Sequence, residues 1–355
     1  MSSAVPTEDP TPAVPSETAI FPRLRLGRRW INLLWTLPLV AVALVALFGL
    51  TTWLRTLPEV QAFIVEYPGT VERAEPQGFP WWLRWQHWLN VIFLVPIVRA
   101  GLQVWAGRPR AYLSHPASPG RDWLRIQKVY PAEGGWSMRD DAVAVHPQIG
   151  IPGGKRGAGV GRLWHLSFAV LWVANGMLFY VLLFATGQWQ RTVPTSLDVF
   201  PNALSAIVQY ASWNFPPQDA WVSYNSVQLL SYFVTTFIAA PLAIVTGAGH
   251  SPVLARRLPW LNSEVAKSLH LGVLAWFIVF TILHVTLVLI THPLENLNHI
   301  ILGTNDSSVA GLVLFLVLLV VGGVLWALAS PLSTKYPNAV QRVGTRILGP
   351  INRWF

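Results

Sequence analysis

Six long apolar stretches constrain the fold of this chain more than any other feature of its sequence. They cover residues 33–54, 81–105, 163–185, 222–246, 268–290 and 309–329, and each is long enough to cross the roughly 30 Å hydrocarbon core of a bilayer as a helix. Lipid offers the backbone no hydrogen-bond partners, so such segments fold as helices, and strands are expected to have no part. The sequence therefore predicts an all-α integral membrane protein built as a six-helix transmembrane bundle.

Positive charge is distributed unevenly over the two sides that these spans define. If the N-terminus is cytoplasmic, only Arg55, Arg73, Arg84 and Arg191 lie outside and Arg99 within a span, out of 25 lysine and arginine residues. Such a bias marks the cytoplasmic side of multi-pass proteins. We therefore expect both termini in the cytoplasm. The basic residues that give the net charge of +9 are expected to lie at the edge of the membrane lipid, and no nucleic acid is expected as a partner.

Four of the nine histidines lie inside the expected spans. His270 and His284 are fourteen residues apart in one span, so at about 100° and 1.5 Å per residue they share a helix face and lie about 21 Å apart. Consecutive spans alternate in direction, which pairs His87 with His284 and His165 with His270 whichever way the bundle is inserted. The alternative for each histidine is a polar residue in a packed interior, but ionisable groups inside membranes are costly and tend to be functional.

Two same-level pairs of neutral imidazoles are what two bis-histidine haems, stacked across a bilayer, require. The chain has no cysteine, which excludes disulfides, thiolate-ligated iron–sulfur clusters and covalent haem attachment. Phosphate-binding loops, hydrolase nucleophile elbows and His-Glu-x-x-His zinc motifs do not occur in the sequence either. Any redox centre is therefore expected to be held by histidine without a covalent bond.

Three basic residues each precede one of these histidines by three positions. Arg84, Arg162 and Lys267 therefore share a face with His87, His165 and His270, one turn nearer the membrane surface. Haem propionates are anionic and point toward water, so we expect these side chains to bind them. Arg99 is a candidate for the same set, and the alternative is that all are ordinary flank residues that extend to the surface.

The remaining histidines carry weaker signals. His115, His146 and His250 fall in loops, where a histidine is usually an ordinary surface residue. His292 and His299 flank the end of the fifth span beside Glu295. This group is a candidate for a quinone or proton path, because oxidation of a quinol releases protons.

The segments outside the core divide the chain further. We expect a disordered tail over 1–29, because its first twenty residues are rich in proline and acidic groups. An additional anchor helix and an outer loop follow over 30–80, and 304–355 holds the sixth span and a basic tail. The core, 81–303, contains four spans and a long inner loop over 107–161, which is either a docking element or an irregular connector. Short amphipathic helices are expected near residues 197–208 and after Ser330.

Short motifs surround the paired histidines. They are RWQHWLN over 84–90, GLQ over 101–103, GRLWH over 161–165, YNSVQ over 224–228 and SLH over 268–270, followed by His284, Asn296-Leu297 and Gly303. With this order and spacing, the chain resembles the bacterial di-haem cytochrome b family, the membrane subunits of nickel–iron hydrogenases, formate dehydrogenases and related molybdenum oxidoreductases. The resemblance covers residues 81–303, four of the six expected spans.

The resemblance implies a function. All four family haem ligands have counterparts here, so it implies two non-covalent haems b that pass electrons between a quinone and a catalytic oxidoreductase subunit, molybdenum-dependent or hydrogenase-like, at a bacterial plasma membrane. The first helix, the long inner loop and Arg99 depart from the family pattern. The first helix also reverses the orientation expected for the core, which leaves open the side on which the catalytic partner lies.

Two other functions fit the same sequence. One is a self-contained transmembrane reductase that reduces a small acceptor such as a metal ion. The other is a haem-free transporter that uses histidines for proton coupling, although only Pro241 in the fourth span suggests the broken helix typical of transporters. A haem spectrum separates the transporter from the other two, and a co-purifying subunit separates the electron-transfer subunit from the reductase.

Overall fold

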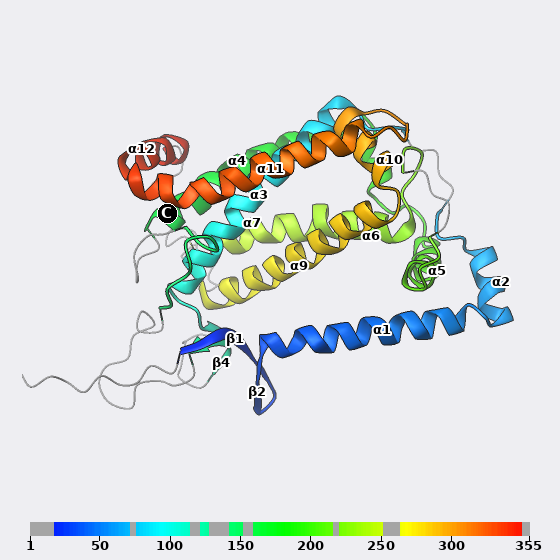
Figure 1. Cartoon of the computed structure of the whole chain (residues 1–355), viewed down its shortest axis with the longest axis horizontal. Helices are drawn as coiled ribbons and strands as arrows, with labels where there is room; N and C mark the ends of the chain where they lie inside the picture. The colour runs from blue at the N-terminus through cyan, green and yellow to red at the C-terminus, as the bar shows by residue number, and fades with distance from the viewer. Residues whose placement is uncertain are drawn as a thin grey trace, which may run out of the picture.

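The computed structural model describes residues 18–71, 76–113, 121–127, 142–151, 159–215, 220–250 and 263–349. In this part of the chain, six helical segments are long and apolar enough to cross a membrane: Leu33–Leu54, Trp81–Ala106, Gly159–Ala185, Ser226–Ala248, Ser263–Ile290 and Ala310–Lys335. They lie alongside one another in Figure 1. The predicted all-α integral membrane fold is confirmed.

The centre of the bundle is formed by α3 (Trp81–Ala106), α4 (Gly159–Ala185) and α9 (Ser263–Ile290). Helices α3 and α4 approach closely where Gly161 faces Gln103, since a Cβ atom at position 161 would lie 2.9 Å from the Gln103 Cγ atom. A buried apolar cluster of Ala239, Val273 and Phe277 joins α9 to the fourth span. This packing brings the helices that carry the four paired histidines together.

The fourth span consists of three consecutive segments. Helix α6 (Ser226–Phe233) begins with a capping box between Asn225 and Gln228, and the π-helix η3 (Val234–Ala239) and α7 (Ala240–Ala248) follow. Proline has no N–H to donate within a helix, and its ring clashes with the carbonyl four residues earlier. The wider π turn before Pro241 accommodates both the clash and the missing hydrogen bond. The Tyr180 hydroxyl donates a 2.5 Å hydrogen bond to the Thr236 carbonyl in this turn.

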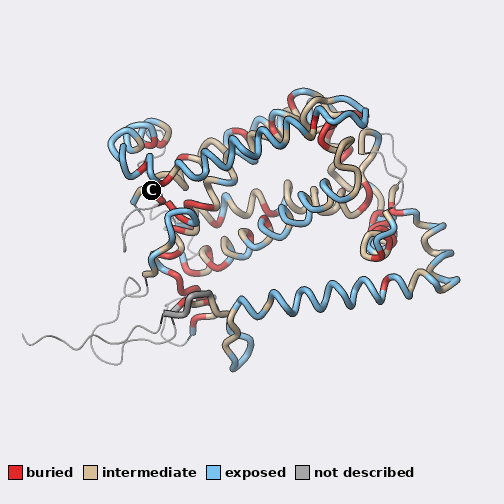
Figure 2. The backbone as a smooth tube through the Cα atoms, in the orientation of Figure 1, coloured by how far each residue is buried: buried red, intermediate tan, exposed pale blue. Residues whose placement is uncertain are grey.

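Two spans lie at the margin of the bundle. Helix α1 (Thr36–Leu54), which follows the short η1 turn (Leu33–Trp35), has Thr51 as its one buried residue. Figure 2 shows α1 exposed along nearly its whole length, and α11 (Ala310–Lys335) exposed over most of its length. Their apolar side chains are therefore suited to face lipid.

A small sheet lies at one end of the bundle, which corrects two predictions. Strands β1 (Thr18–Leu26), β2 (Arg29–Asn32), β3 (Ala111–Tyr112) and β4 (Asp122–Gln127) form an antiparallel sheet of order β2-β1-β4-β3. The expectation that strands have no part was wrong, because the rule against open sheets holds only inside lipid.

The disordered tail predicted over 1–29 was also wrong for residues 18–29, while residues 1–17 lie outside the described part. Strand β1 alternates arginine with leucine from Arg23 to Leu26, a pattern suited to a half-buried strand. The sheet is joined internally by Arg125, which lies 3.7 Å from the Trp30 ring centre, and by the buried ion pair of Arg110 with Asp122, 2.9 Å apart. Of the inner loop, only β3, β4 and residues 142–151 are described besides the residues that flank the spans.

Two short helices cover the ends of the bundle. Helix α5 (Val199–Ala211), at the end opposite the sheet, is seen nearly end-on in Figure 1, so it runs across the spans. It matches the amphipathic helix predicted there, with Phe200 and Leu204 exposed and Asn202 buried. At the sheet end, α12 (Pro337–Leu348) packs against α4 through Gly344, which faces Leu163. The other short helices are α2 (Pro58–Glu66), η2 (Gln188–Arg191), α10 (Pro293–Leu297) and the π-helix η4 (Asn298–Leu302).

Candidate functional site

Four histidines from three helices meet as two pairs inside the bundle, and the ring centre of a fifth, His250, lies 6.3 Å from that of His270. The ring centres of His87 on α3 and His284 on α9 are 6.3 Å apart, and those of His165 on α4 and His270 on α9 are 6.2 Å apart. These are the two pairs that the alternation of the spans predicts. We refer to them as the His87–His284 level and the His165–His270 level; the sheet lies at the end of the bundle nearer the second.

Both separations fit a six-coordinate iron between the two rings. A metal–imidazole bond is about 2 Å long and a ring nitrogen is about 1 Å from the ring centre, so two imidazoles that held one metal ion between them would have their centres about 6 Å apart. Within the described residues no group of three or more metal-binding side chains occurs. A porphyrin, which supplies four nitrogens itself, needs only the two protein ligands that each level offers.

At the His165–His270 level, the Nδ1 atom of each ring has a hydrogen-bond partner. His165 Nδ1 lies 2.9 Å from the Ile97 carbonyl oxygen on α3, and His270 Nδ1 lies 2.9 Å from the Thr246 hydroxyl on α7. Gly101 permits the first contact, because a Cβ atom there would lie 3.2 Å from His165 Nδ1. A partner on one imidazole nitrogen sets which nitrogen is free to bind metal.

The His87–His284 level is lined by aromatic rings. His284 stacks on Phe280 at 5.5 Å and meets the edge of Tyr232 at 5.9 Å, and His87 lies edge-on to Trp88 at 5.4 Å. The buried His87 Nδ1 has no hydrogen-bond partner among the described residues. This level therefore differs from the other in what surrounds the imidazoles.

An aromatic pair lies between the two levels along α9. Phe277, midway in sequence between His270 and His284, is buried and meets Trp172 of α4 edge-on, with ring centres 6.2 Å apart. The Trp276 indole nitrogen donates a 3.1 Å hydrogen bond to the Thr235 hydroxyl in η3. The interior between the levels is thus filled by ring side chains.

The basic residues expected at the propionates have different surroundings in the structure. Arg84 donates a 3.1 Å hydrogen bond to the Ile301 carbonyl in η4, and Arg162 is exposed at the start of α4. The Lys267 ammonium group donates to the carbonyl oxygens of Arg108 and Arg110. Lys267 therefore connects α9 to the segment that leads into the sheet.

Arg99 does not have the surroundings of a propionate ligand. Its guanidinium group is buried and donates to the carbonyls of Pro147, Gly150 and Trp326 and to the Ser330 hydroxyl. The group also lies 4.4 Å from the Trp326 ring centre. The sequence-based candidate role for Arg99 is therefore wrong, because residues 142–151 fold back onto α3 and α11 and take up its donors.

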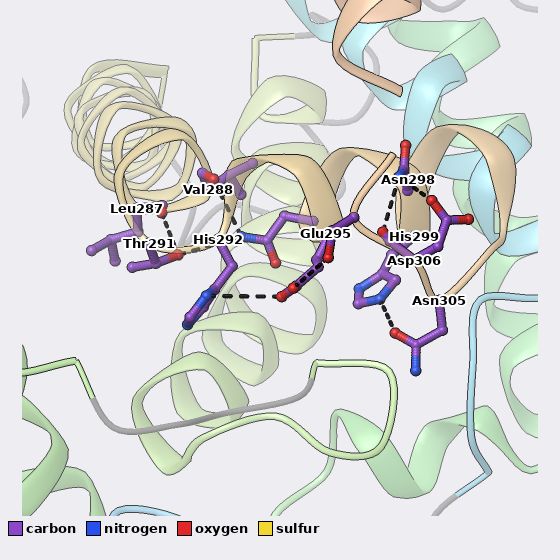
Figure 3. A network of polar contacts seen from close by, with 11 residues as sticks. Leu287, Val288, Thr291, His292, Glu295, Asn298, His299, Asn305 and Asp306 are labelled. Carbon is purple, nitrogen blue, oxygen red and sulfur yellow. Dashed lines mark hydrogen bonds and ion pairs between the residues drawn. The ribbon is translucent and has the colours of Figure 1, made fainter. Parts of the chain in front are cut away.

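A second cluster lies beyond the His87–His284 level, where His292, Glu295 and His299 follow α9 (Figure 3). His292 and Glu295 are 3.8 Å apart, and both are exposed. His299 is buried in η4; its Nε2 atom lies 2.8 Å from the Asn305 side-chain oxygen, and its Nδ1 atom has no partner among the described residues. Single-turn π-helices such as η4 occur frequently at functional sites.

Aromatic rings connect His284 to His299. Tyr232 meets Tyr224 at 5.0 Å, Tyr224 meets Phe79 at 6.4 Å, and Phe79 stacks on His299 at 5.4 Å. The buried Arg191 guanidinium lies 4.4 Å from the Tyr224 ring centre. Reasoning from the sequence missed Phe79 and Arg191 as parts of this cluster, because a loop and η2 bring them together with Tyr224 only through the tertiary fold.

The loop between η4 and α11 is held by an acidic residue. Hydrogen bonds from Thr304 and Ser308 lower the pKa of Asp306 to about 2. Its side chain also accepts a 2.7 Å hydrogen bond from the Asn298 amide. These contacts fix the end of the π-helix that carries His299.

Comparison with known protein families identifies the family of this chain. The model of a family described as prokaryotic cytochrome b561 matches residues 78–303. This range contains all four paired histidines and His299. No curated protein and no solved structure matches the chain.

Proposed function

This chain belongs to the prokaryotic cytochrome b561 family, and we propose that it is an electron-transfer subunit that carries two non-covalent haems b between the quinone pool and a partner oxidoreductase. A membrane cytochrome b with a role in electron transfer is what the family match and the six spans establish. The number of haems, their ligands, the quinone and the partner are our proposals.

The observation that carries the proposal is the pair of equal histidine separations. Ring centres 6.3 and 6.2 Å apart, at two depths of one bundle, suit one haem at each level. His87 and His284 would hold one haem, and His165 and His270 the other. Bound haem iron supplies one-electron chemistry; the protein residues orient the imidazoles and exclude water.

The second part of the proposal concerns the quinone. We place its headgroup beside His299, where a buried imidazole nitrogen without a partner among the described residues lies against Phe79 and Trp221. A quinone ring is flat and carries two oxygens, so it suits an aromatic surface with one polar group. Glu295 lies one turn from His299 and His292 about two turns away; both side chains are partly exposed and suit proton exchange with water.

The third part concerns orientation. The first and last described residues lie at the sheet end of the bundle (Figure 1), and the segments there carry most of the basic residues. We therefore place both termini at the cytoplasmic face of a bacterial plasma membrane.

Haem analysis of the purified protein tests the proposal. We expect a red protein with the reduced α-band of haem b and two haems per chain in a haemochrome assay. A colourless preparation would favour the haem-free transporter. A red protein that reduces a metal ion without any co-purifying subunit would favour the self-contained reductase.

Cysteine labelling tests the orientation on a chain that has no native cysteine. Arg28 lies in the turn before β2 and Thr195 near α5, at opposite ends of the bundle, and both are exposed. In intact cells, an impermeant maleimide should label Thr195→Cys and leave Arg28→Cys unlabelled. The reverse pattern would overturn the assignment.

A further inference from the structure

Thr246, in the last turn of α7, is fully buried against His270. The Thr246 hydroxyl donates a 2.6 Å hydrogen bond to the Leu242 carbonyl four residues earlier, as threonine hydroxyls commonly do in helices. The hydroxyl oxygen also lies 2.9 Å from His270 Nδ1. A hydroxyl has one hydrogen, and the shortest of its contacts, the one to Leu242, is the one to which we assign that hydrogen.

The protonation state of His270 follows from this count. Since the hydroxyl hydrogen points to Leu242, Thr246 receives a hydrogen bond, and His270 Nδ1 must carry the proton. A neutral imidazole protonated at Nδ1 has its lone pair on Nε2. The remaining nitrogen is therefore the one available to an iron.

We propose that Thr246 is a positioning residue that fixes His270 with Nε2 free for iron and lowers the midpoint potential of the haem at the His165–His270 level. The proposal rests on the function proposed above. It adds a residue that contacts no haem iron itself and that no motif in the sequence identifies.

The expected direction follows from ligand basicity. An imidazole that donates its other N–H to an acceptor becomes a stronger base toward the metal. A stronger base stabilises the oxidised, more positive iron, and so makes the haem harder to reduce. His165 has a similar donor–acceptor contact with the Ile97 carbonyl, but a backbone acceptor cannot be removed by substitution, whereas Thr246 can.

The midpoint potential of the haem proposed at the His87–His284 level is the internal reference for changes at Thr246. The buried His87 Nδ1 has no partner among the described residues. A change at Thr246 should therefore act on one haem and leave the other unchanged.

The test compares three variants in redox titrations followed by optical and EPR spectra. Thr246→Val removes the acceptor and keeps the shape, so it should raise the midpoint potential of one haem and shift the low-spin EPR signal of that haem. Thr246→Ser keeps the hydroxyl and should titrate as the wild type.

Thr235→Val is the matched control. Thr235 lies in the same span, donates a 2.7 Å hydrogen bond to the carbonyl four residues earlier and accepts one from Trp276, but it does not contact a paired histidine in the described structure. Its potentials should equal those of the wild type. If Thr246→Val and Thr235→Val shift both haems alike, the effect is general loosening and the proposal is overturned.

Other results are equally decisive. Unchanged potentials in Thr246→Val, or a Thr246→Ser titration that shifts as the valine variant does, would contradict the positioning role. If Thr246→Val binds only one haem, Thr246→Ser must restore the second haem, and failure to restore it overturns the proposal. Absence of haem from the wild-type protein would instead refute the proposed function, so the two failures are distinguishable.

Discussion

The two histidine levels differ in how their imidazoles are held. At the His165–His270 level, both Nδ1 atoms have hydrogen-bond partners, on α3 and α7. At the His87–His284 level, aromatic rings surround the imidazoles, and the His87 Nδ1 has no partner among the described residues. Nearly equal ring separations are therefore reached with hydrogen bonds at one level and with aromatic packing at the other. A hydrogen bond to the second ring nitrogen changes the basicity of a metal-binding imidazole, whereas aromatic packing does not.

The two ends of the bundle also differ in the kind of contact that holds them, polar at one end and aromatic at the other. Beside the His165–His270 level, Lys267 and the buried pair of Arg110 with Asp122 connect α9 to a sheet. Beside the His87–His284 level, rings continue from His284 through Tyr232 to His299. One end is therefore joined by charged and polar contacts, and the other by aromatic rings.

Gly101→Leu should produce the largest difference between the levels. A Cβ atom at position 101 would lie 3.2 Å from His165 Nδ1, and the rest of a leucine has to displace the imidazole. We expect loss of one of the two haems, measured as half the haem content of the wild type, with the other spectrum intact. Gly176→Leu is the control in α4, because a Cβ atom there meets no neighbouring atom within 4 Å. Equal haem loss in both variants would contradict the comparison.

His299→Ala should slow the haem reduction by quinol that is proposed for the aromatic end of the bundle. Losing one hydrogen bond to a bound quinone costs about 1–2 kcal/mol, so quinol-driven haem reduction should slow by about tenfold. Stopped-flow reduction by a water-soluble quinol measures this rate, and reduction by dithionite should be unaffected. His292→Ala, an exposed residue of the same cluster, is the comparison and should retain most of the rate. A normal quinol rate in His299→Ala would remove the quinone from this end.

Arg99→Ala should alter stability without altering either haem. Its guanidinium joins residues 142–151 to α3 and α11, and hydrogen bonds made by a charged group each contribute about 1.5–3 kcal/mol. We expect a loss on the order of 3 kcal/mol in local stability, seen as faster hydrogen exchange over residues 142–151. The midpoint potentials should stay the same. A selective fall in the potential of one haem would restore the propionate role that the structure argues against.

Arg162→Ala should give the smallest effect, confined to the His165–His270 level. A positive charge near a haem favours the reduced form, but an exposed charge is screened. The potential of that haem should fall by about 40 mV or less. Arg342→Ala, which removes an exposed arginine from α12 at the same end, is the charge-matched control. A larger shift in the other haem would contradict the level assignment.

The sequence predicted the six spans and both histidine pairs because these depend on simple regularities. Apolar length identifies a span, and the alternation of consecutive spans decides which histidines share a level. The sheet was missed because β1 pairs with β4 across about one hundred residues, and the alternation of arginine and leucine in β1 is short. Arg99 was misassigned for a similar reason, since its partners come from a loop and from α11.

Thr246 shows where prediction from the sequence ends. A threonine in an apolar span ordinarily bonds only to its own helix, and nothing local distinguishes Thr246 from Thr235. The difference arises because α7 packs on α9 at the height of His270. Such a contact depends on the relative rotation of two helices, which hydropathy does not determine.

Haem content and redox titration of four alanine variants test whether the four histidines act as two specific pairs. His87→Ala and His284→Ala should each lose the same one of the two haem components. His165→Ala and His270→Ala should each lose the other component. If the two variants of one pair lose different haem components, the pairing is wrong. It is also wrong if any of these variants retains both haems with unaltered spectra.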